Sequence, residues 1–250
     1  MAEYDNRVRS YGATSDVAID AGLRAYMLRV YNYMLMGLAL TGLTAWFTAS
    51  TPAFAQLFFT QAAGGYSLSG LGWIVLLAPL ALVFFISFRI QQMSFATAQA
   101  TFWVYAGLMG IGLTPILLLY TGASVAQVFF VTAATFGAMS LWGYTTKRDL
   151  SGFGTFLMMG LMGLMLAIVV NIVLKAFGVA TGPMDFIISC AGVLIFAGLT
   201  AYDTQTIKEM YDAMDDGTVA GRKALMGALK LYLDLINIFL FLLQLLGDRR

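Results

Sequence analysis

Long apolar runs, separated by short polar connections, dominate the chain. Seven of them are long enough to cross about 30 Å of hydrocarbon, which takes about 20 residues of α-helix. They lie at roughly 25–48, 71–90, 97–120, 124–146, 153–176, 184–207 and 226–246. The pattern predicts an all-α membrane protein, a seven-transmembrane-helix bundle in residues 25–250 that follows a polar N-terminal tail in residues 1–24.

Composition supports the membrane prediction. Hydrophobic residues make up 60% of the chain and charged residues only 11%, whereas a soluble domain normally carries about 25% charged residues. Between Arg29 and Lys147 the sole charged residue is Arg89. Water could not solvate such a surface, so we expect a lipid bilayer around it. The net charge of +1 gives no support for a nucleic-acid partner.

The placement of Lys and Arg predicts the orientation. If the N-terminus is cytoplasmic, only three of the 14 basic residues (Lys175, Arg249 and Arg250) lie outside, and the other eleven lie inside. Such a bias indicates a cytoplasmic N-terminus. Seven crossings would then put the C-terminus outside. Because the last apolar run carries Lys230 and Asp234, a partial or re-entrant crossing remains an alternative for it.

The scarcity of histidine and cysteine limits which catalytic and metal sites the chain could form. The chain has no histidine, which excludes Ser-His triads and the usual zinc sites. Its single cysteine, Cys190, lies in an apolar run and cannot form a disulfide framework. We therefore expect no enzymatic activity and no resident cofactor. Any pH sensing must use carboxylates, since histidine is the usual group that titrates near neutral pH.

Three ionisable residues are predicted to lie at membrane depth. Asp203 falls about one turn inside the cytoplasmic end of the sixth span, and Asp234 about two turns inside the start of the seventh. Arg89 ends the second span on the same side. A charge at this depth costs several kcal/mol unless it is paired, hydrated or neutralised. Two carboxylates and a guanidinium in the same third of the bilayer therefore point to a functional site.

Each of these residues also has a purely structural interpretation. Arg89 could extend to the lipid headgroups. Asp234 could pair with Lys230 one turn earlier on its own helix, and Asp203 could be an interfacial residue bonded to Thr206. These alternatives stay open at the level of sequence.

Asp234 is the hardest of the three to explain structurally. Asn237 lies three residues later on the same helical face, so the two make a polar stripe that should face protein or water. If Asp203 faces Asp234, the two carboxylates would share one proton and could titrate near neutral pH. The neutral pair would clasp two helices together. The charged pair would recruit Arg89 or bind a hard cation such as calcium.

Three segments resemble a known family. AGLTAYDTQTIKEMY at 197–211 and LKLYLDLINIFLFLLQLLGDRR at 229–250 are similar to the last two helices of the Bax inhibitor-1 family, also called the transmembrane Bax inhibitor motif family. GIGLTPILLLY at 110–120 resembles its third-helix signature. The spacing of the seven spans agrees as well, so the resemblance covers about residues 20–250.

The resemblance implies a bacterial inner-membrane protein whose last helix is central in the bundle. It also implies a pH-sensitive calcium leak channel, gated by an aspartate pair that matches Asp203 and Asp234 and latched by an arginine that matches Arg89. Some members carry an acidic residue within the second helix, but this chain has none at 71–88. The polar residues that could support the pair are Tyr202, Thr206, Lys230 and Asn237.

Two rival functions follow from related features. Bacterial members of the family are also linked to inhibition of a membrane-anchored AAA protease, which the tail at 1–24 could engage. Tyr202-Asp203 also resembles half of the intramembrane aspartyl protease signature. The other half, Gly-x-Gly-Asp, is missing around Asp234, because Leu-Tyr-Leu precedes that residue. The sequence therefore favours a channel, with the protease regulator as the alternative.

Overall fold

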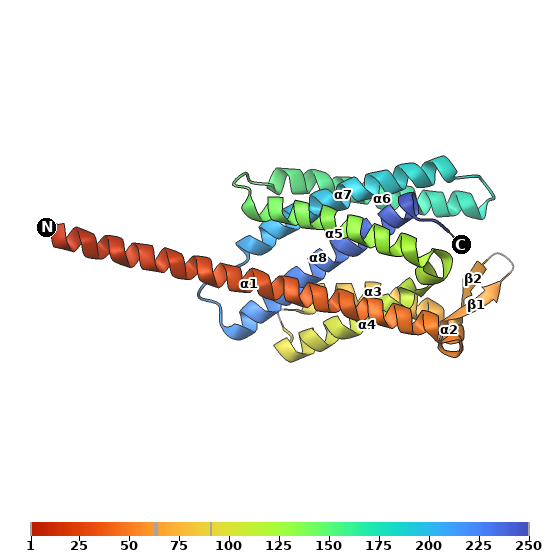
Figure 1. Ribbon diagram of the computed structural model, residues 1–250, viewed down its shortest axis with the longest axis horizontal. Helices are drawn as coiled ribbons and strands as arrows, with labels where there is room; N and C mark the ends of the chain where they lie inside the picture. The colour runs from red at the N-terminus through yellow and green to blue at the C-terminus, as the bar shows by residue number, and fades with distance from the viewer. Residues whose placement is uncertain (1, 63–64, 91, 250) are drawn as a thin grey trace.

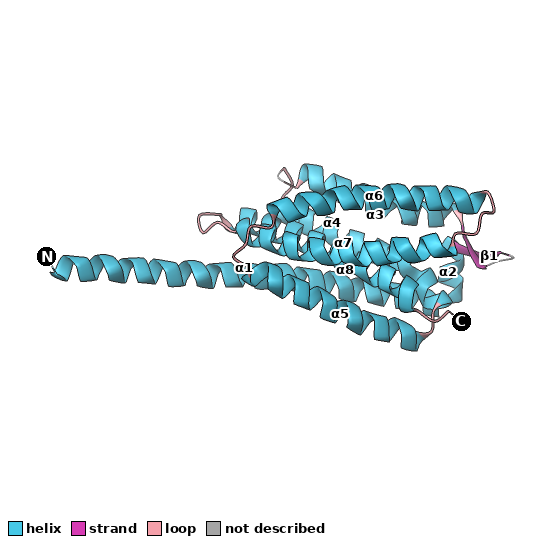
Figure 2. Cartoon of the chain, turned by 90° about the horizontal axis from the view of Figure 1, so that it is seen from above, coloured by secondary structure: helices cyan, strands magenta, loops and turns pink. Residues whose placement is uncertain are grey.

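The computed structural model describes the backbone of residues 2–62, 65–90 and 92–249, and the side chains of these residues except those of 2–20, 61–62 and 65–66. In this part of the chain, helices account for nearly all of the regular structure (Figures 1 and 2). The elements are α1 (Ala2–Ser50), α2 (Pro52–Phe58), β1 (Phe59–Ala62), β2 (Gly65–Leu68), α3 (Gly70–Arg89), α4 (Phe95–Leu119), α5 (Gly122–Thr145), α6 (Ser151–Ala176), α7 (Gly182–Glu209) and α8 (Gly217–Leu246).

Six helices, α3 to α8, are each long and apolar enough to cross a membrane. Five of them begin and end within about two residues of the predicted spans. The exception is α8, which begins at Gly217, nine residues before the predicted span at 226–246. Asp216 explains the early start, because its carboxylate accepts hydrogen bonds from the backbone N–H groups of Thr218 (2.8 Å) and Val219 (2.7 Å). This is the usual role of an N-cap aspartate.

The predicted first span lies within α1. Residues 21–50 and α2 together are long and apolar enough for one crossing, but they are bent by 104° at the break between them. A seventh crossing therefore stays a prediction. The backbone of α1 is helical from Ala2, and its N-terminal part projects beyond the other helices (Figure 1). The separate tail predicted for residues 1–24 stays a prediction as well.

The connection between the first two predicted spans is not a simple loop. It contains α2 and an antiparallel hairpin, in which Phe59 of β1 lies opposite Leu68 of β2. Ser69 then ends the hairpin and caps α3 by accepting a hydrogen bond from Gly72 N at 3.0 Å. Ser94 and Thr121 cap α4 and α5 in the same way. Polar residues between the apolar runs thus fix where the long helices begin.

The last helix packs against four others, namely α1, α4, α5 and α7. In Figure 1 it runs obliquely between α1, α3 and α4 on one side and α5, α6 and α7 on the other. Its fully buried Tyr232 donates to or accepts from the hydroxyl of Thr41 at 2.7 Å. Thr41 in turn donates to the Ala106 carbonyl at 2.9 Å. One buried polar contact therefore joins α1, α4 and α8.

The two ends of the bundle differ in charge. The α3–α4, α5–α6 and α7–α8 connections lie at one end, which carries most of the basic residues and is called the basic end below. Those residues are Arg24, Arg89, Lys147, Arg148, Lys208, Arg222 and Lys223. The opposite end carries Lys175 and Arg249. The C-terminal segment is held to the α4–α5 turn by a 3.1 Å hydrogen bond from Thr121 N to Asp248 O.

Candidate functional site

An ion pair joins α7 to α8 inside the bundle. Nζ of Lys230 lies 3.3 Å from Oδ1 of Asp203. The Asp203 side chain is 15% exposed and the Lys230 side chain 34%, so water screens the pair only in part. The contact is possible because α7 and α8 pack closely against each other. An ammonium group thus meets the first of the two predicted gating carboxylates.

The second carboxylate, Asp234, is buried, with 4% of the residue exposed. It lies one turn after Lys230 and therefore on the same face of α8. Its Oδ2 atom is shielded from solvent and has no hydrogen-bond partner among the described residues. A buried carboxylate oxygen is strongly unfavourable unless a proton, a water molecule or a cation meets it. Asp234 is therefore the residue of this region that most needs a partner.

Asp203, Lys230 and Asp234 line a single cavity of about 570 Å³. The rest of its wall comes from α3, α4, α6 and further residues of α7 and α8, most of them apolar. Tyr105 of α4 also lines the cavity, and its buried hydroxyl has no partner among the described residues. The polar groups are thus gathered in a mostly apolar chamber, where charge interactions are stronger than in water.

The four supporting residues predicted from the sequence divide into two groups. Lys230 and Asn237 line the cavity with the aspartates, and the Asn237 amide donates to the Leu233 carbonyl at 2.8 Å. Tyr202 instead packs its ring against Gly154 of α6. Thr206 donates to the Tyr202 carbonyl at 3.0 Å rather than to Asp203. The structure therefore gives no direct role at the pair to Tyr202 or Thr206.

The predicted latch is not formed in this structure. The side chain of Arg89 is exposed and donates to Oε1 of Gln92 at 3.1 Å, and it does not line the cavity. The helix that carries Arg89, α3, packs mainly on α4 and α2. The cation beside the carboxylates is Lys230. Lys230 forms its ion pair with Asp203 on the neighbouring helix. The purely structural interpretation of Asp234 required a pair between Lys230 and Asp234 instead.

A model of the family described as "Inhibitor of apoptosis-promoting Bax1" matches residues 23–250. The chain belongs to the Bax inhibitor-1 family. Together with the six apolar helices, this makes it a multi-pass, all-α membrane protein. The match includes both motif segments that carry the aspartates.

Similar proteins come from several bacteria. "Inner membrane protein YbhL" of Escherichia coli (strain K12) is 45% identical over 232 residues, which are 92% of this chain and 94% of that protein. "Uncharacterized protein RP147" of Rickettsia prowazekii (strain Madrid E) is 44% identical over 231 residues, 92% of each chain. A Caulobacter vibrioides protein is 44% identical over 238 residues, 94% of this chain and 93% of its own.

In this Bax inhibitor-1 family protein, the sequence did not predict a chain of hydrogen-bonded hydroxyl groups that ends next to Asp203. The hydroxyl of Tyr31 on α1 lies 2.7 Å from Oγ of Ser140 on α5, which lies 3.0 Å from Oγ1 of Thr204 on α7. Gln205 fastens α7 to the α5–α6 connection through 2.8 Å bonds with Leu150 N and Arg148 O. Thr204 and Gln205 belong to the motif at 197–211. Their place in that motif is the sequence feature that could have marked them as part of the site.

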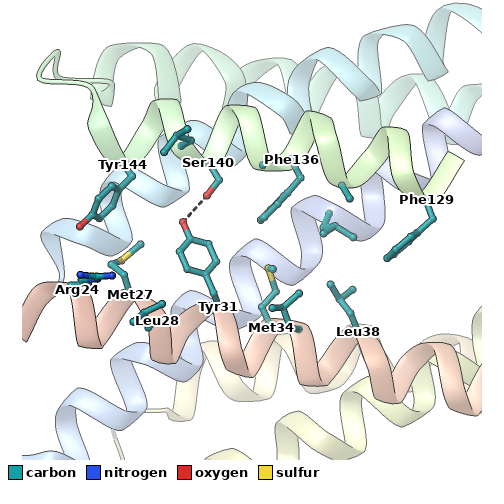
Figure 3. Close-up of a pocket in the computed structure, with 15 residues that line it drawn as sticks. Arg24, Met27, Leu28, Tyr31, Met34, Leu38, Phe129, Phe136, Ser140 and Tyr144 are labelled. Carbon is teal, nitrogen blue, oxygen red and sulfur yellow. Dashed lines mark hydrogen bonds between the residues drawn. The ribbon is translucent and has the colours of Figure 1, made fainter. Parts of the chain in front are cut away.

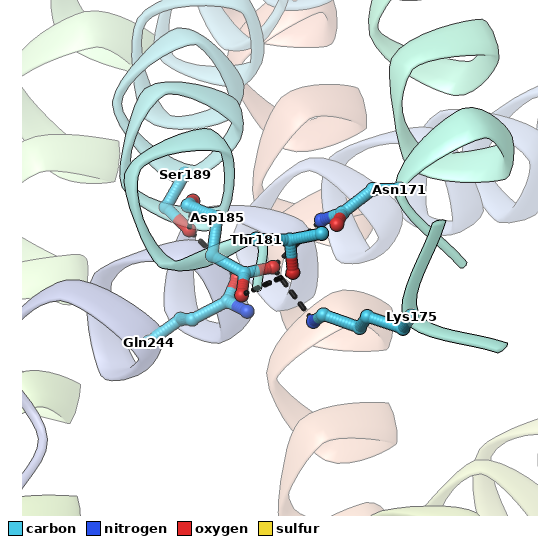
Figure 4. A network of polar contacts seen from close by, with 6 residues as sticks. All are labelled: Asn171, Lys175, Thr181, Asp185, Ser189 and Gln244. Carbon is cyan, nitrogen blue, oxygen red and sulfur yellow. Dashed lines mark hydrogen bonds and ion pairs between the residues drawn. The ribbon is translucent and has the colours of Figure 1, made fainter. Parts of the chain in front are cut away.

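A second polar cluster joins α6, α7 and α8 at the opposite end (Figure 4). Asp185 accepts from Lys175 Nζ at 2.8 Å and from the Asn171 amide at 2.6 Å. Ser189 donates to Oε1 of Gln244 at 2.7 Å. Asp185 lies 18 residues before Asp203 on α7, which is about 27 Å of helix. This cluster is therefore separate from the cavity and holds the far ends of three helices together.

Proposed function

We propose that this Bax inhibitor-1 family protein is a pH-sensitive calcium leak channel of the bacterial inner membrane, gated by protonation of Asp203 and Asp234. The single observation that carries the proposal is the shared cavity, in which Asp234 has a buried oxygen without a partner among the described residues. The chain has no histidine, so these carboxylates are the natural proton acceptors there.

The ligand chemistry of the cavity fits calcium as the transported ion. Calcium takes about 6–8 oxygen ligands, and the cavity offers two carboxylates, the Asn237 amide and the Tyr105 hydroxyl. Water would have to supply the remaining ligands, as expected for an ion that permeates and is not permanently bound. Calcium is here a substrate, and we propose neither a resident cofactor nor an enzymatic activity.

In this proposal Lys230 takes the latch role that the family resemblance implied for Arg89. Its ammonium group occupies the position beside Asp203 that a permeating cation would need. A cation can bind there only when the ion pair opens or when Asp203 exchanges its partner. In this mechanism the pair holds the closed state, and the protonation of the two aspartates sets how strongly Lys230 is retained.

The membrane arrangement is part of the same proposal. Residues 21–50 with α2 form the seventh crossing, α8 is the central helix of the bundle, and the N-terminus is cytoplasmic. Support comes from the contacts of α8 with α1, α4, α5 and α7 and from the Lys and Arg residues of the basic end, which the positive-inside rule assigns to the cytoplasm. The name of the Escherichia coli relative, an inner membrane protein, supports the location.

Calcium flux into liposomes, measured across about pH 5 to 8, tests the proposal. Asp203→Asn should flatten the pH dependence, because the amide has nearly the same size as the carboxyl group but takes up no proton in this range. The protein should still fold, since Asp203 remains partly exposed and Lys230 can hydrogen-bond to the amide oxygen.

Asp149→Asn is the matched control. Asp149 lies between α5 and α6 at the basic end, and the pKa of its carboxyl group is lowered because the backbone N–H of Ser151 and then its side chain hydrogen-bond to the carboxylate. The group therefore stays ionised across neutral pH, and its replacement should leave the pH profile unchanged. Equal flattening by both variants, or none by Asp203→Asn, would refute gating by Asp203.

A second candidate function is supported by the projecting N-terminal part of α1 (Figure 2). We propose it as an alternative in which the protein regulates a membrane-anchored AAA protease through this segment. Deletion of residues 2–20 separates the two functions. A channel should keep its calcium flux after the deletion, because the cavity lies among α3, α4, α6, α7 and α8. A protease regulator should lose its effect on substrate turnover by the co-purified protease.

A further inference from the structure

A groove lies between α1 and α5 (Figure 3), and it shares no lining residue with the aspartate cavity. It has a volume of about 670 Å³, within the range of about 300–1,000 Å³ found for ligand pockets. Both helices pack on α8, whose Leu235 contributes to the groove, but they do not pack closely on each other. The groove therefore results from the way in which α1 and α5 are arranged around α8.

The lining of the groove is apolar over most of its length. Its floor contains buried side chains, such as Met27, Met34 and Phe136, and its rim contains exposed ones, such as Leu35 and Leu141. Methionine side chains are flexible and adapt to irregular apolar shapes. An opening of this kind on a membrane-spanning bundle faces the acyl chains of the bilayer.

One mouth of the groove is cationic. Arg24 lies there next to Tyr144 (Figure 3), and Nζ of Lys208 lies 5.2 Å from the centre of the Tyr144 ring. Among the described residues Arg24 has no ion-pair partner, and none of the residues that line the groove is acidic. This mouth is at the basic end, where α5 ends, so it lies at the level of the lipid headgroups.

The dimensions of the groove match one leaflet. Along α1 the lining runs from Arg24 to Leu38 (Figure 3), and this separation of 14 positions corresponds to about 21 Å of helix. One leaflet of the hydrocarbon core is about 15 Å thick. An acyl chain could therefore lie along the groove while its headgroup stays at the cationic mouth.

We infer that the α1–α5 groove binds an anionic phospholipid, with one acyl chain along the apolar lining and the headgroup phosphate at Arg24. The charge of the mouth selects the anionic headgroup, and the apolar length selects a lipid over a soluble anion. Inside the groove the lipid would lie against the Tyr31–Ser140 hydrogen bond, whose hydroxyl chain ends at Thr204, the neighbour of Asp203. Lipid binding does not depend on calcium transport and can be tested without it.

Native mass spectrometry of the detergent-solubilised protein tests the site with two probes, phosphatidylglycerol and phosphatidylcholine with identical acyl chains. The wild type should retain phosphatidylglycerol about fivefold better, the effect of one basic residue near an anionic headgroup. Arg24→Gln should abolish that preference. Arg29→Gln is the matched control, because Arg29 is an exposed arginine of the same helix that does not line the groove, and it should leave the preference intact.

A second pair of variants tests the apolar part. Gly137 lines the groove and has open space where a side chain would begin, so Gly137→Leu should fill the groove without disturbing the fold and should reduce retention of both lipids. Gly112→Leu is its control, at a helical glycine with the same open space that does not line the groove.

Three outcomes would overturn the inference. They are equal retention of the two lipids by the wild type, an unchanged preference in Arg24→Gln, and a Gly137→Leu variant that retains lipid as the wild type does. A stable dimer that releases lipid would instead assign the groove to a second copy of the chain.

Discussion

Replacing Asp234 by Asn is expected to remove most of the pH dependence of calcium permeation near neutral pH. Asp234 is buried at 4% exposure, and its Oδ2 atom has no partner among the described residues. Asparagine keeps the shape of the side chain but cannot exchange the proton. The measurement is calcium flux into liposomes across about pH 5 to 8, with protein folding checked by size-exclusion chromatography in the same detergent.

The double variant distinguishes one coupled site from two independent ones. If Asp203 and Asp234 share a proton, each single Asn substitution already destroys the shared state, and combining them should add little to the loss. Independent groups would give losses that add up. An Asp234→Asn protein with the full wild-type pH profile would show that the carboxylate has only a structural role, whatever Asp203 does.

The hydrophobic pattern predicted much of the architecture because the bilayer imposes a length on every crossing. A run of about 20 apolar residues has few alternatives to a membrane-spanning helix, and α3 to α7 accordingly lie where the pattern put them. The same reasoning placed Asp203 and Asp234 at similar depth, and both line one cavity. Depth can be read from sequence because it depends on counting residues from the end of a span.

Apart from the Asp234–Asn237 stripe, which lines the cavity, the direction in which a residue faces could not be predicted in the same way. A helix in lipid is apolar on its exposed side as well as on its packed side, so periodicity does not reveal which side contacts protein. Arg89 has the predicted depth but lies on a helix that packs on α4 and α2. Lys230 has two carboxylates within reach, one turn along α8 and across on α7, and only the packing of the two helices decides between them.

Replacing Lys230 by Met is expected to raise calcium flux at neutral pH about fivefold. The substitution removes the ammonium group beside Asp203 while keeping the length of the apolar stem, so a cation can take the vacated position. Fivefold corresponds to about 1 kcal/mol, the upper end for ion pairs that water partly screens, and a third of the Lys230 side chain is exposed. Initial calcium uptake rates in liposomes at equal protein content provide the measurement.

Two further variants decide whether Lys230 or Arg89 holds the closed state. Lys230→Arg keeps a cation at the same place and should stay close to the wild-type rate. Arg89→Ala should also change little, because Arg89 contacts Gln92 and does not line the cavity. A large increase in flux for Arg89→Ala together with none for Lys230→Met would reverse the assignment. In that case the channel must visit a second state in which α3 brings Arg89 to the aspartates, and the Lys230–Asp203 pair would belong to a different step of the cycle.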